Sequence, residues 1–125
     1  MEHKPTQGLY GWITHVDIAS SDPAASKEWC EAVLGWNFMA NLSTPAGEYH
    51  LFSYSEKGGG GIRALGPIEA PGCVPFVHVA NTQEAFEKAI REGAVEVNAP
   101  TKVMEGVTTA LVRAPGGFLI GFSGP

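Results

Sequence analysis

The stretch "THVDIASSDPAASKEWCEAVLGW", residues 14–36, decides the fold of this chain. Its first part alternates polar and apolar residues, which predicts a strand over about Tyr10–Ala19. "SDPAASKEWCEAVLGW" then predicts a helix, because Asp22 can cap free N–H groups and Pro23 suits the first helical turn. Gly35 follows the last apolar residue and is typical of a helix end. The stretch therefore predicts a strand followed directly by a helix.

The alternation in this strand separates its side chains onto two faces. Val16 and Ile18, together with Trp12, are expected to face the core. His15 and Asp17 share the other face, which meets either water or a binding pocket.

Apolar residues recur at helical spacing in the helix and predict one buried stripe made of Ala25, Trp29, Ala32 and Val33. On this pattern Trp29 is expected to belong to the core. The only cysteines, Cys30 and Cys73, fall in the helix and at the start of a later strand, and we expect both to be reduced thiols.

The second half of the chain repeats the first. After the helix we expect strands over residues 36–43, 48–55 and 60–65, with turns at "TPAG" (44–47) and in the flexible "EKGGGGI" (56–62). A Gly- and Pro-rich loop, 66–72, precedes a strand over 74–81, a helix over 81–94 and strands over 95–103, 107–114 and 118–123. In that helix Asn81 is the cap, Gly93 is the stop, and the buried stripe is Ala85, Phe86, Ala89 and Ile90.

The repeated order β-α-β-β-β predicts an α+β fold, in which two tandem βαβββ modules form a curved mixed sheet around a cleft. We expect an N-terminal tail over residues 1–8 and a single domain over 9–125, with modules at about 9–66 and 71–125. A shared cleft is the expected place for function.

Composition excludes several classes of function. The formal net charge is −5, and the eight lysines and arginines form no run, which argues against a nucleic-acid partner. No apolar stretch approaches the roughly 20 residues that span a bilayer, so no membrane partner is expected. The N-terminus lacks the apolar core of a signal peptide, and a cytoplasmic location is expected.

The chain resembles the vicinal-oxygen-chelate superfamily, which includes glyoxalase I, extradiol dioxygenases, and fosfomycin- and bleomycin-resistance proteins. The resemblance rests on "THVDIASSDPAASKEWCEAVLGW" and on "VRAPGGFLIGFS", residues 112–123, which is similar to the family ending "xDPxGxxxEL". It covers about Leu9 to Gly124. Because one fold hosts many chemistries, the resemblance predicts the fold better than the function.

In metal-dependent members of that superfamily, the first and last strands of each half supply four metal ligands. Carried over onto this chain, those positions fall on His15, Val74, Arg63 and Gly121. Only His15 is a ligand type, and an arginine repels a cation. We therefore expect no metal cofactor, with a divalent metal as the alternative.

The expected ligand-binding residues are His15, Asp17, Arg63, Phe76 and His78; no catalytic residue is identified. Arg63 either pairs with Asp17 as a structural ion pair or holds a ligand carboxylate or phosphate bidentately. An unusual metal set would draw on His15, Asp17, Glu48, His50 and His78.

The expected function is binding of a small anionic or aromatic organic molecule in the cleft, by a protein that has lost the superfamily's metal site. One alternative is a metal-dependent lyase, isomerase or dioxygenase with an unusual ligand set. A second is a non-catalytic interaction module. Members of the superfamily commonly form dimers, so a homodimer is a possible partner arrangement.

Overall fold

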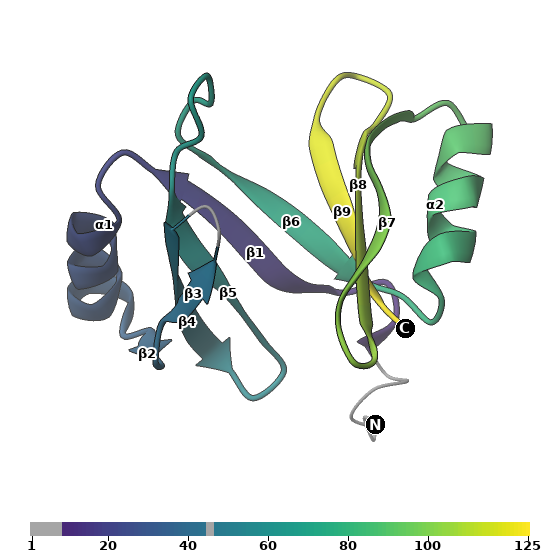
Figure 1. Ribbon diagram of the computed structural model, residues 1–125. Coiled ribbons are helices and arrows are strands. Elements are labelled where there is room, and N and C mark those ends of the chain that lie inside the picture. Colours follow the sequence, from purple (N-terminus) through teal and green to yellow (C-terminus); the bar gives the residue numbers. More distant parts are fainter. Residues whose placement is uncertain (1–8, 45–46) are drawn as a thin grey trace. The chain divides into compact units, whose positions relative to one another are not determined.

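A computed structural model describes residues 9–44 and 47–125, and Figure 1 shows the order of the elements along the chain. The first repeat contains β1 (Ile13–Ser20), α1 (Pro23–Trp29), a π-helical turn η2 (Cys30–Leu34), β2 (Asn37–Phe38), β3 (Leu42–Thr44), β4 (Gly47–Ser55) and β5 (Gly58–Ala64). The second contains β6 (Gly72–His78), α2 (Thr82–Arg91), β7 (Val95–Met104), β8 (Val107–Arg113) and β9 (Leu119–Gly124). The tail over 1–8 and the middle of the "TPAG" turn lie outside the described residues.

The chain divides into two compact units. The first unit is residues 15–73, with strands in the order β2-β4-β5-β1 and β3 paired to β4. The second unit contains residues 9–14 and 74–125, with strands in the order β6-β9-β8-β7. Each unit combines one parallel pair, β1–β5 or β6–β9, with antiparallel neighbours. The predicted α+β fold with two βαβββ repeats and a mixed sheet is confirmed.

The boundary between the units differs from the predicted boundary between the modules. Residues 9–14 belong with the second repeat, because the backbone of Gly11 donates to the His78 carbonyl (2.8 Å) and the backbone of His78 donates to the Trp12 carbonyl (2.8 Å). The chain thus contributes its N-terminal segment to the second unit before it begins the first.

The core of the first unit lies between its sheet and α1. Phe52 and Ile62 are fully buried at its centre, with Trp36 stacked on Phe52 at 4.3 Å between ring centroids. Val16 and Ile18 pack against this cluster, which confirms the predicted core face of β1 at these two positions. The prediction is wrong for Trp12, which precedes β1 and is 47% exposed. His15 and Asp17 consequently lie on the opposite face of the sheet.

The predicted buried stripe of α1 is wrong. Its four residues are exposed, with Trp29 at 58% and Val33 at 59%, and Cys30 is the residue that enters the core. The helix is α-helical only to Trp29 and continues as a π-helical turn, which has more residues per turn and breaks the 3.6-residue spacing. The Ser20 and Ser26 hydroxyls, 2.7 Å apart, also connect the first turns of α1 to the end of β1. Gly35 ends the turn with φ of 68°, as predicted.

The prediction for the glycine run is wrong at Gly58 and Gly59, which were expected in the turn, and right at Gly60 and Gly61, which were expected in a strand. Only Glu56 and Lys57 form the turn, whereas Gly58–Gly61 belong to β5, and Gly60 and Gly61 are buried. A run of glycines that suggests a mobile turn therefore forms the first half of a central strand.

The second unit packs α2 against its sheet through Phe86, which is buried with Ala110 and Val112. The Asn81 side chain accepts a hydrogen bond from the Glu84 backbone, so the predicted cap is confirmed. Of the predicted stripe, Ala85 and Ala89 are half-buried and Ile90 is 37% exposed. Both cysteines are free, as predicted. Within the described ranges, no helix has the length and apolarity needed to cross a bilayer.

The reassigned face of α1 predicts a contrast between two aromatic substitutions. Phe52→Ala should lower the free energy of unfolding by about 3–5 kcal/mol, because it leaves a cavity in the core. Trp29→Ala should change it by less than about 1 kcal/mol, because most of that side chain already contacts solvent. Urea unfolding of the two variants and the wild type measures both values. A Trp29→Ala protein as unstable as Phe52→Ala would contradict the exposed placement of Trp29.

Candidate functional site

The candidate site lies on the face of the first unit's sheet that α1 does not cover. On β1, His15 and Asp17 point to this face, and their partners on β5 are Gly59 and Gly61. Glycines leave this part of β5 without side chains. A side chain from β4, the next strand, can therefore extend across β5 to reach β1.

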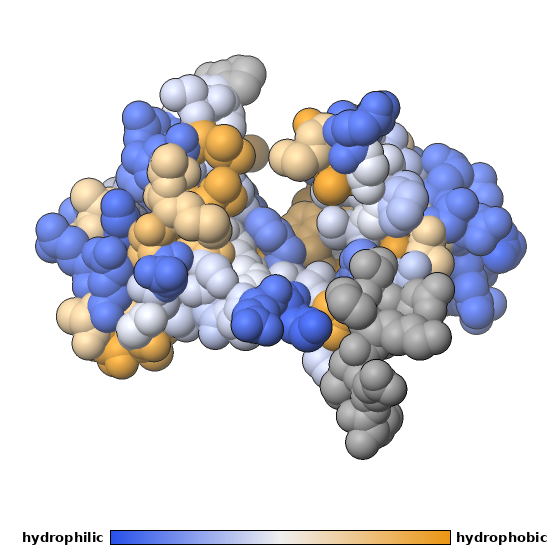
Figure 2. Space-filling model, turned by 90° about the horizontal axis from the view of Figure 1, so that it is seen from below, coloured by the Kyte–Doolittle hydropathy of each residue, from blue (hydrophilic) through white to orange (hydrophobic). Residues whose placement is uncertain are grey.

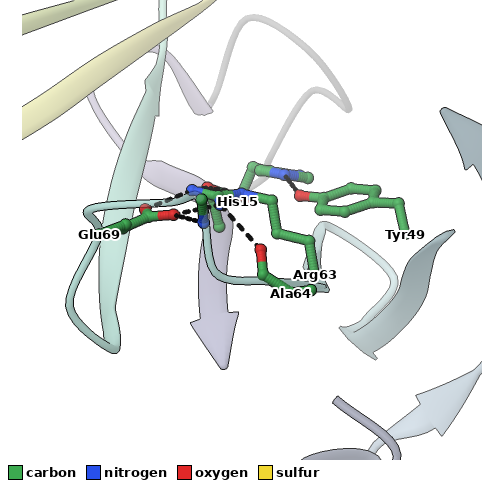
Figure 3. A network of polar contacts seen from close by, with 7 residues as sticks. His15, Tyr49, Arg63, Ala64 and Glu69 are labelled. Carbon is green, nitrogen blue, oxygen red and sulfur yellow. Dashed lines mark hydrogen bonds and ion pairs between the residues drawn. The ribbon is translucent and has the colours of Figure 1, made fainter. Parts of the chain in front are cut away.

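Tyr49 makes that contact. Its hydroxyl lies 3.0 Å from His15 Nε2, and the two rings are 6.4 Å apart at 28° (Figure 3). The Tyr49 ring covers Gly61 so closely that a Cβ at position 61 would lie 2.1 Å from Tyr49 Cζ. The His15–Tyr49 contact therefore requires glycine at that position.

Both members of this pair are uncharged at neutral pH. Burial lowers the pKa of His15 below its ordinary value, and the negative charge of Asp17 offsets part of this effect. Burial also raises the pKa of Tyr49 well above its ordinary value, and Asp17 adds to this increase. A neutral imidazole and a neutral phenol each offer one donor and one acceptor, so the pair can orient a polar ligand without carrying charge.

Arg63 lies at the centre of a second group of contacts. Its Nε donates to Asp17 Oδ2 (3.1 Å), and its Nη2 lies 3.0 Å from the same oxygen. Its Nη1 and Nη2 donate to the two carboxylate oxygens of Glu69, at 2.7 and 2.8 Å, and Nη1 also donates to the Ala64 carbonyl at 3.3 Å (Figure 3). One cation thus faces two carboxylates, and the group carries a formal charge of −1.

These contacts shift the ionisation of both partners. The hydrogen bonds from Arg63, followed by that from the Gly66 backbone, lower the pKa of Glu69 to about 2. The hydrogen bond to Glu69 is also the main reason that the pKa of Arg63 rises above its ordinary value. The side chains of Asp17, Arg63 and Glu69 are 19%, 32% and 35% exposed, so solvent screens the outer pair more than the inner one.

Three of the five predicted site residues, His15, Asp17 and Arg63, lie on this face of the first unit. The other two lie in the second unit. Phe76 lies over Gly121, where a Cβ would be 2.3 Å from its ring, and His78 stacks on Tyr10 at 5.3 Å between ring centroids. The site also contains Tyr49 and Glu69, which the sequence analysis did not select.

The register of the two units corrects one predicted correspondence. Asp17 and Phe76 each lie five residues before a helix cap, and their partners across the parallel pair are Gly61 and Gly121. The counterpart of Gly121 is therefore Gly61, two residues before Arg63. Neither glycine offers a side-chain donor.

The residues around His15 do not fit a divalent metal ion. His15 Nε2 lies at hydrogen-bond distance from a neutral phenol, and the carboxylate of Asp17 is paired with the Arg63 cation, which would repel a metal. Among residues 9–44 and 47–125, no three His, Cys, Asp or Glu side chains are grouped to hold a metal. His50 lies next to Tyr49 on β4 and so points to the opposite face of the sheet.

Comparison with known proteins identifies the fold of this chain. No protein-family model and no curated protein sequence matches the chain. The methylmalonyl-CoA epimerase from Mycobacterium tuberculosis has a similar structure, with a TM-score of 0.73 over 94% of this chain and 89% of that chain, at 17% identity. A hypothetical protein from Bacillus halodurans C-125 has a TM-score of 0.69 over 89% and 91%, at 16% identity.

The chain has the vicinal-oxygen-chelate fold, as its sequence resemblance implied. Methylmalonyl-CoA epimerases recur among the similar structures. One, from Streptomyces coelicolor and solved with 2-nitronate-propionyl-CoA, has a TM-score of 0.68 over 92% of this chain and 96% of that chain, at 15% identity. At these identities the likeness establishes the fold alone.

The packing of Tyr49 on Gly61 predicts the effect of one added methyl group. Gly61→Ala should displace the Tyr49 ring and remove its hydrogen bond to His15, which would change the imidazole signals of His15 in an NMR spectrum. Gly72→Ala is the matched control, because a Cβ there has no atom within 4 Å. Identical His15 signals in the Gly61→Ala protein and the wild type would contradict the proposed packing.

The pKa of His15 predicts a pH effect with a definite sign. Because burial lowers this pKa, the unfolded chain binds more protons at His15 than the folded chain just below pH 6.5. This group's contribution to stability is therefore full above about pH 6.5 and is lost as the pH falls towards the lower folded value. An NMR titration should give a pKa below 6.5 for His15, and a still lower one in Asp17→Asn. A rise of the His15 pKa in Asp17→Asn would contradict the role of Asp17 as the charge that raises this pKa. Glu48→Gln is the control.

Proposed function

We propose that this protein binds a small organic ligand on the face of its first unit's sheet that lies opposite the core, and that it does so without a resident metal. The observation that carries the proposal is the pairing of two different polar groups on that face. The His15–Tyr49 pair is neutral, and the Asp17–Arg63–Glu69 group is charged. Together they offer a ligand both hydrogen bonding and a cation.

The surroundings of Tyr49 support an aromatic or otherwise planar ligand. Leu42 is paired with Tyr49 across β3 and β4 and is 43% exposed. Leu51, two residues further along β4, shares the face and is half-buried. Figure 2 shows hydrophobic residues beside hydrophilic ones on one face of the molecule. Pockets for organic ligands typically combine apolar contact with a few placed polar groups.

A structural role alone explains the charged group less well. Removing ions from water costs free energy that their attraction only partly offsets, so a partly buried ion pair is weak evidence for a contribution to stability. The planar guanidinium, in contrast, presents a fork of donors that matches the geometry of a ligand carboxylate or phosphate. This supports Arg63 as a binding residue.

The second candidate function is an isomerase. Several proteins of similar fold are methylmalonyl-CoA epimerases, one of them solved with methylmalonyl-CoA and NH4+. A neutral His15 beside a phenol is chemically able to accept and return a proton. The test uses methylmalonyl-CoA in D2O, and NMR measures the exchange of its α-hydrogen for deuterium. The measurement is made in EDTA and repeated with added Mn2+, Zn2+ or Ni2+.

We propose a cytoplasmic protein, which the two free thiols support. The alternatives are a homodimer, which analytical ultracentrifugation tests, and a non-catalytic interaction module, which the ligand screen tests.

Tyr49→Phe tests the binding function directly. A thermal-shift screen of aromatic acids, aromatic amides and acyl-CoA compounds, run in EDTA, should give a compound that raises the melting temperature. Tyr49→Phe keeps the ring but removes the hydroxyl, and should weaken that compound about 5- to 10-fold, as expected for the loss of one hydrogen bond of about 1 kcal/mol.

Tyr10→Phe is the matched control, because Tyr10 lies in the second unit. The proposal would be contradicted if no compound raised the melting temperature, or if binding were seen only in the absence of EDTA. Equal affinity of Tyr49→Phe and the wild type would show that the ligand binds elsewhere.

A further inference from the structure

Glu69 binds Arg63 in the geometry that an arginine uses for a ligand carboxylate. Two parallel hydrogen bonds, 2.7 and 2.8 Å long, join Nη1 and Nη2 to the two oxygens of one carboxylate. This fork arrangement is the specific way in which guanidinium groups recognise carboxylates and phosphates. The position that an acidic ligand would take on Arg63 is therefore filled by the protein's own side chain.

The two carboxylates on Arg63 are held differently. Asp17 belongs to β1, between Val16 and Ile18 of the packed core face, and its side chain is 19% exposed. Glu69 belongs to the connecting segment 65–71, between the end of β5 and the start of β6, and is 35% exposed. Strand pairing fixes the position of Asp17, whereas Glu69 has no such constraint.

Polar contacts alone attach the middle of this segment. The Glu69 backbone donates to the Gly66 carbonyl (3.2 Å), and the Gly66 backbone donates to Glu69 Oε1 (2.9 Å). Ile68, the one large apolar side chain of the turn, is fully exposed at 101%. A turn without buried apolar contacts opens at a small cost, because little apolar surface moves into water.

We infer that Glu69 is an internal stand-in for the ligand's acidic group, so that a carboxylate ligand binds Arg63 by exchange with Glu69. The inference rests on the proposed function and narrows its ligand to an acid. On exchange, the ligand carboxylate takes the hydrogen bonds of Nη1 and Nη2, Asp17 stays on Nε, and the Gly66–Glu69 turn moves into solvent. The formal charge around Arg63 is the same before and after, so the ligand meets no additional repulsion.

Exchange also explains how the site can select its ligand. A tethered carboxylate competes at an effective concentration in the millimolar range, so a simple anion at lower concentration does not displace it. A ligand that also contacts Tyr49 and Leu42 displaces Glu69, because these contacts add to its affinity. The apparent affinity of the ligand for the protein equals its intrinsic affinity for the open form multiplied by the fraction of molecules in which Glu69 has left Arg63.

Glu69→Gln tests the exchange, because glutamine keeps the size of the side chain and the acceptor for the Gly66 backbone but removes the competing charge. The probes are benzoate and its uncharged counterpart benzamide, titrated into 15N-labelled wild type, Glu69→Gln and the control Glu105→Gln. Glu105 forms an exposed ion pair with Lys102 in the second unit and so matches the loss of charge. We expect Glu69→Gln to bind benzoate about 3- to 10-fold more tightly than the wild type, with benzamide unchanged, and Glu105→Gln to behave as the wild type.

A second measurement follows the turn itself. In the wild type, benzoate should shift the amide signals of Gly66 and Glu69, whereas benzamide should not. Benzoate affinity that is equal or weaker in Glu69→Gln, or absent from both proteins, would overturn the exchange. If benzamide or another compound then still binds in a Tyr49-dependent manner, the exchange is wrong while the proposed binding function stands.

Discussion

The ring of Tyr49 can lie against β5 only because position 61 has no side chain, and the candidate site depends on this close approach. A Cβ at that position would overlap the ring at 2.1 Å. With glycine there, a residue of β4 reaches across β5 to His15 on β1, and an uncharged donor–acceptor pair forms on the face of the sheet opposite the core. In the second unit a ring also lies over a glycine, but Phe76 is the direct cross-strand partner of Gly121 and so corresponds to Asp17 rather than to Tyr49.

Local signals in the sequence predict the fold well, because each depends on neighbouring residues. Asp22 and Asn81 cap their helices as expected, and the alternation in β1 places Val16 and Ile18 in the core. The buried face of α1 could not be predicted in the same way. Its orientation depends on a π-helical turn and on a hydroxyl contact to β1, and periodicity assumes a regular helix.

The site was partly predictable for a related reason. His15 and Asp17 stand out within one strand, and Arg63 falls on one of the ligand positions that the superfamily resemblance implies. Tyr49 and Glu69 were missed, because their roles depend on strand register and on a loop that returns to its own strand. The register also moves the counterpart of Gly121 from Arg63 to Gly61, a shift of two residues that counting from turns cannot detect.

The three tryptophans have unequal environments, which matters for optical studies of this protein. Trp36 is stacked on Phe52 at an interplanar angle of 12°, whereas Trp12 and Trp29 are 47% and 58% exposed. Loss of packing therefore changes the surroundings of Trp36 most, and Trp36 belongs to the first unit. A red shift of the emission spectrum during denaturation would chiefly monitor that unit, and circular dichroism would be needed to follow the other half of the molecule.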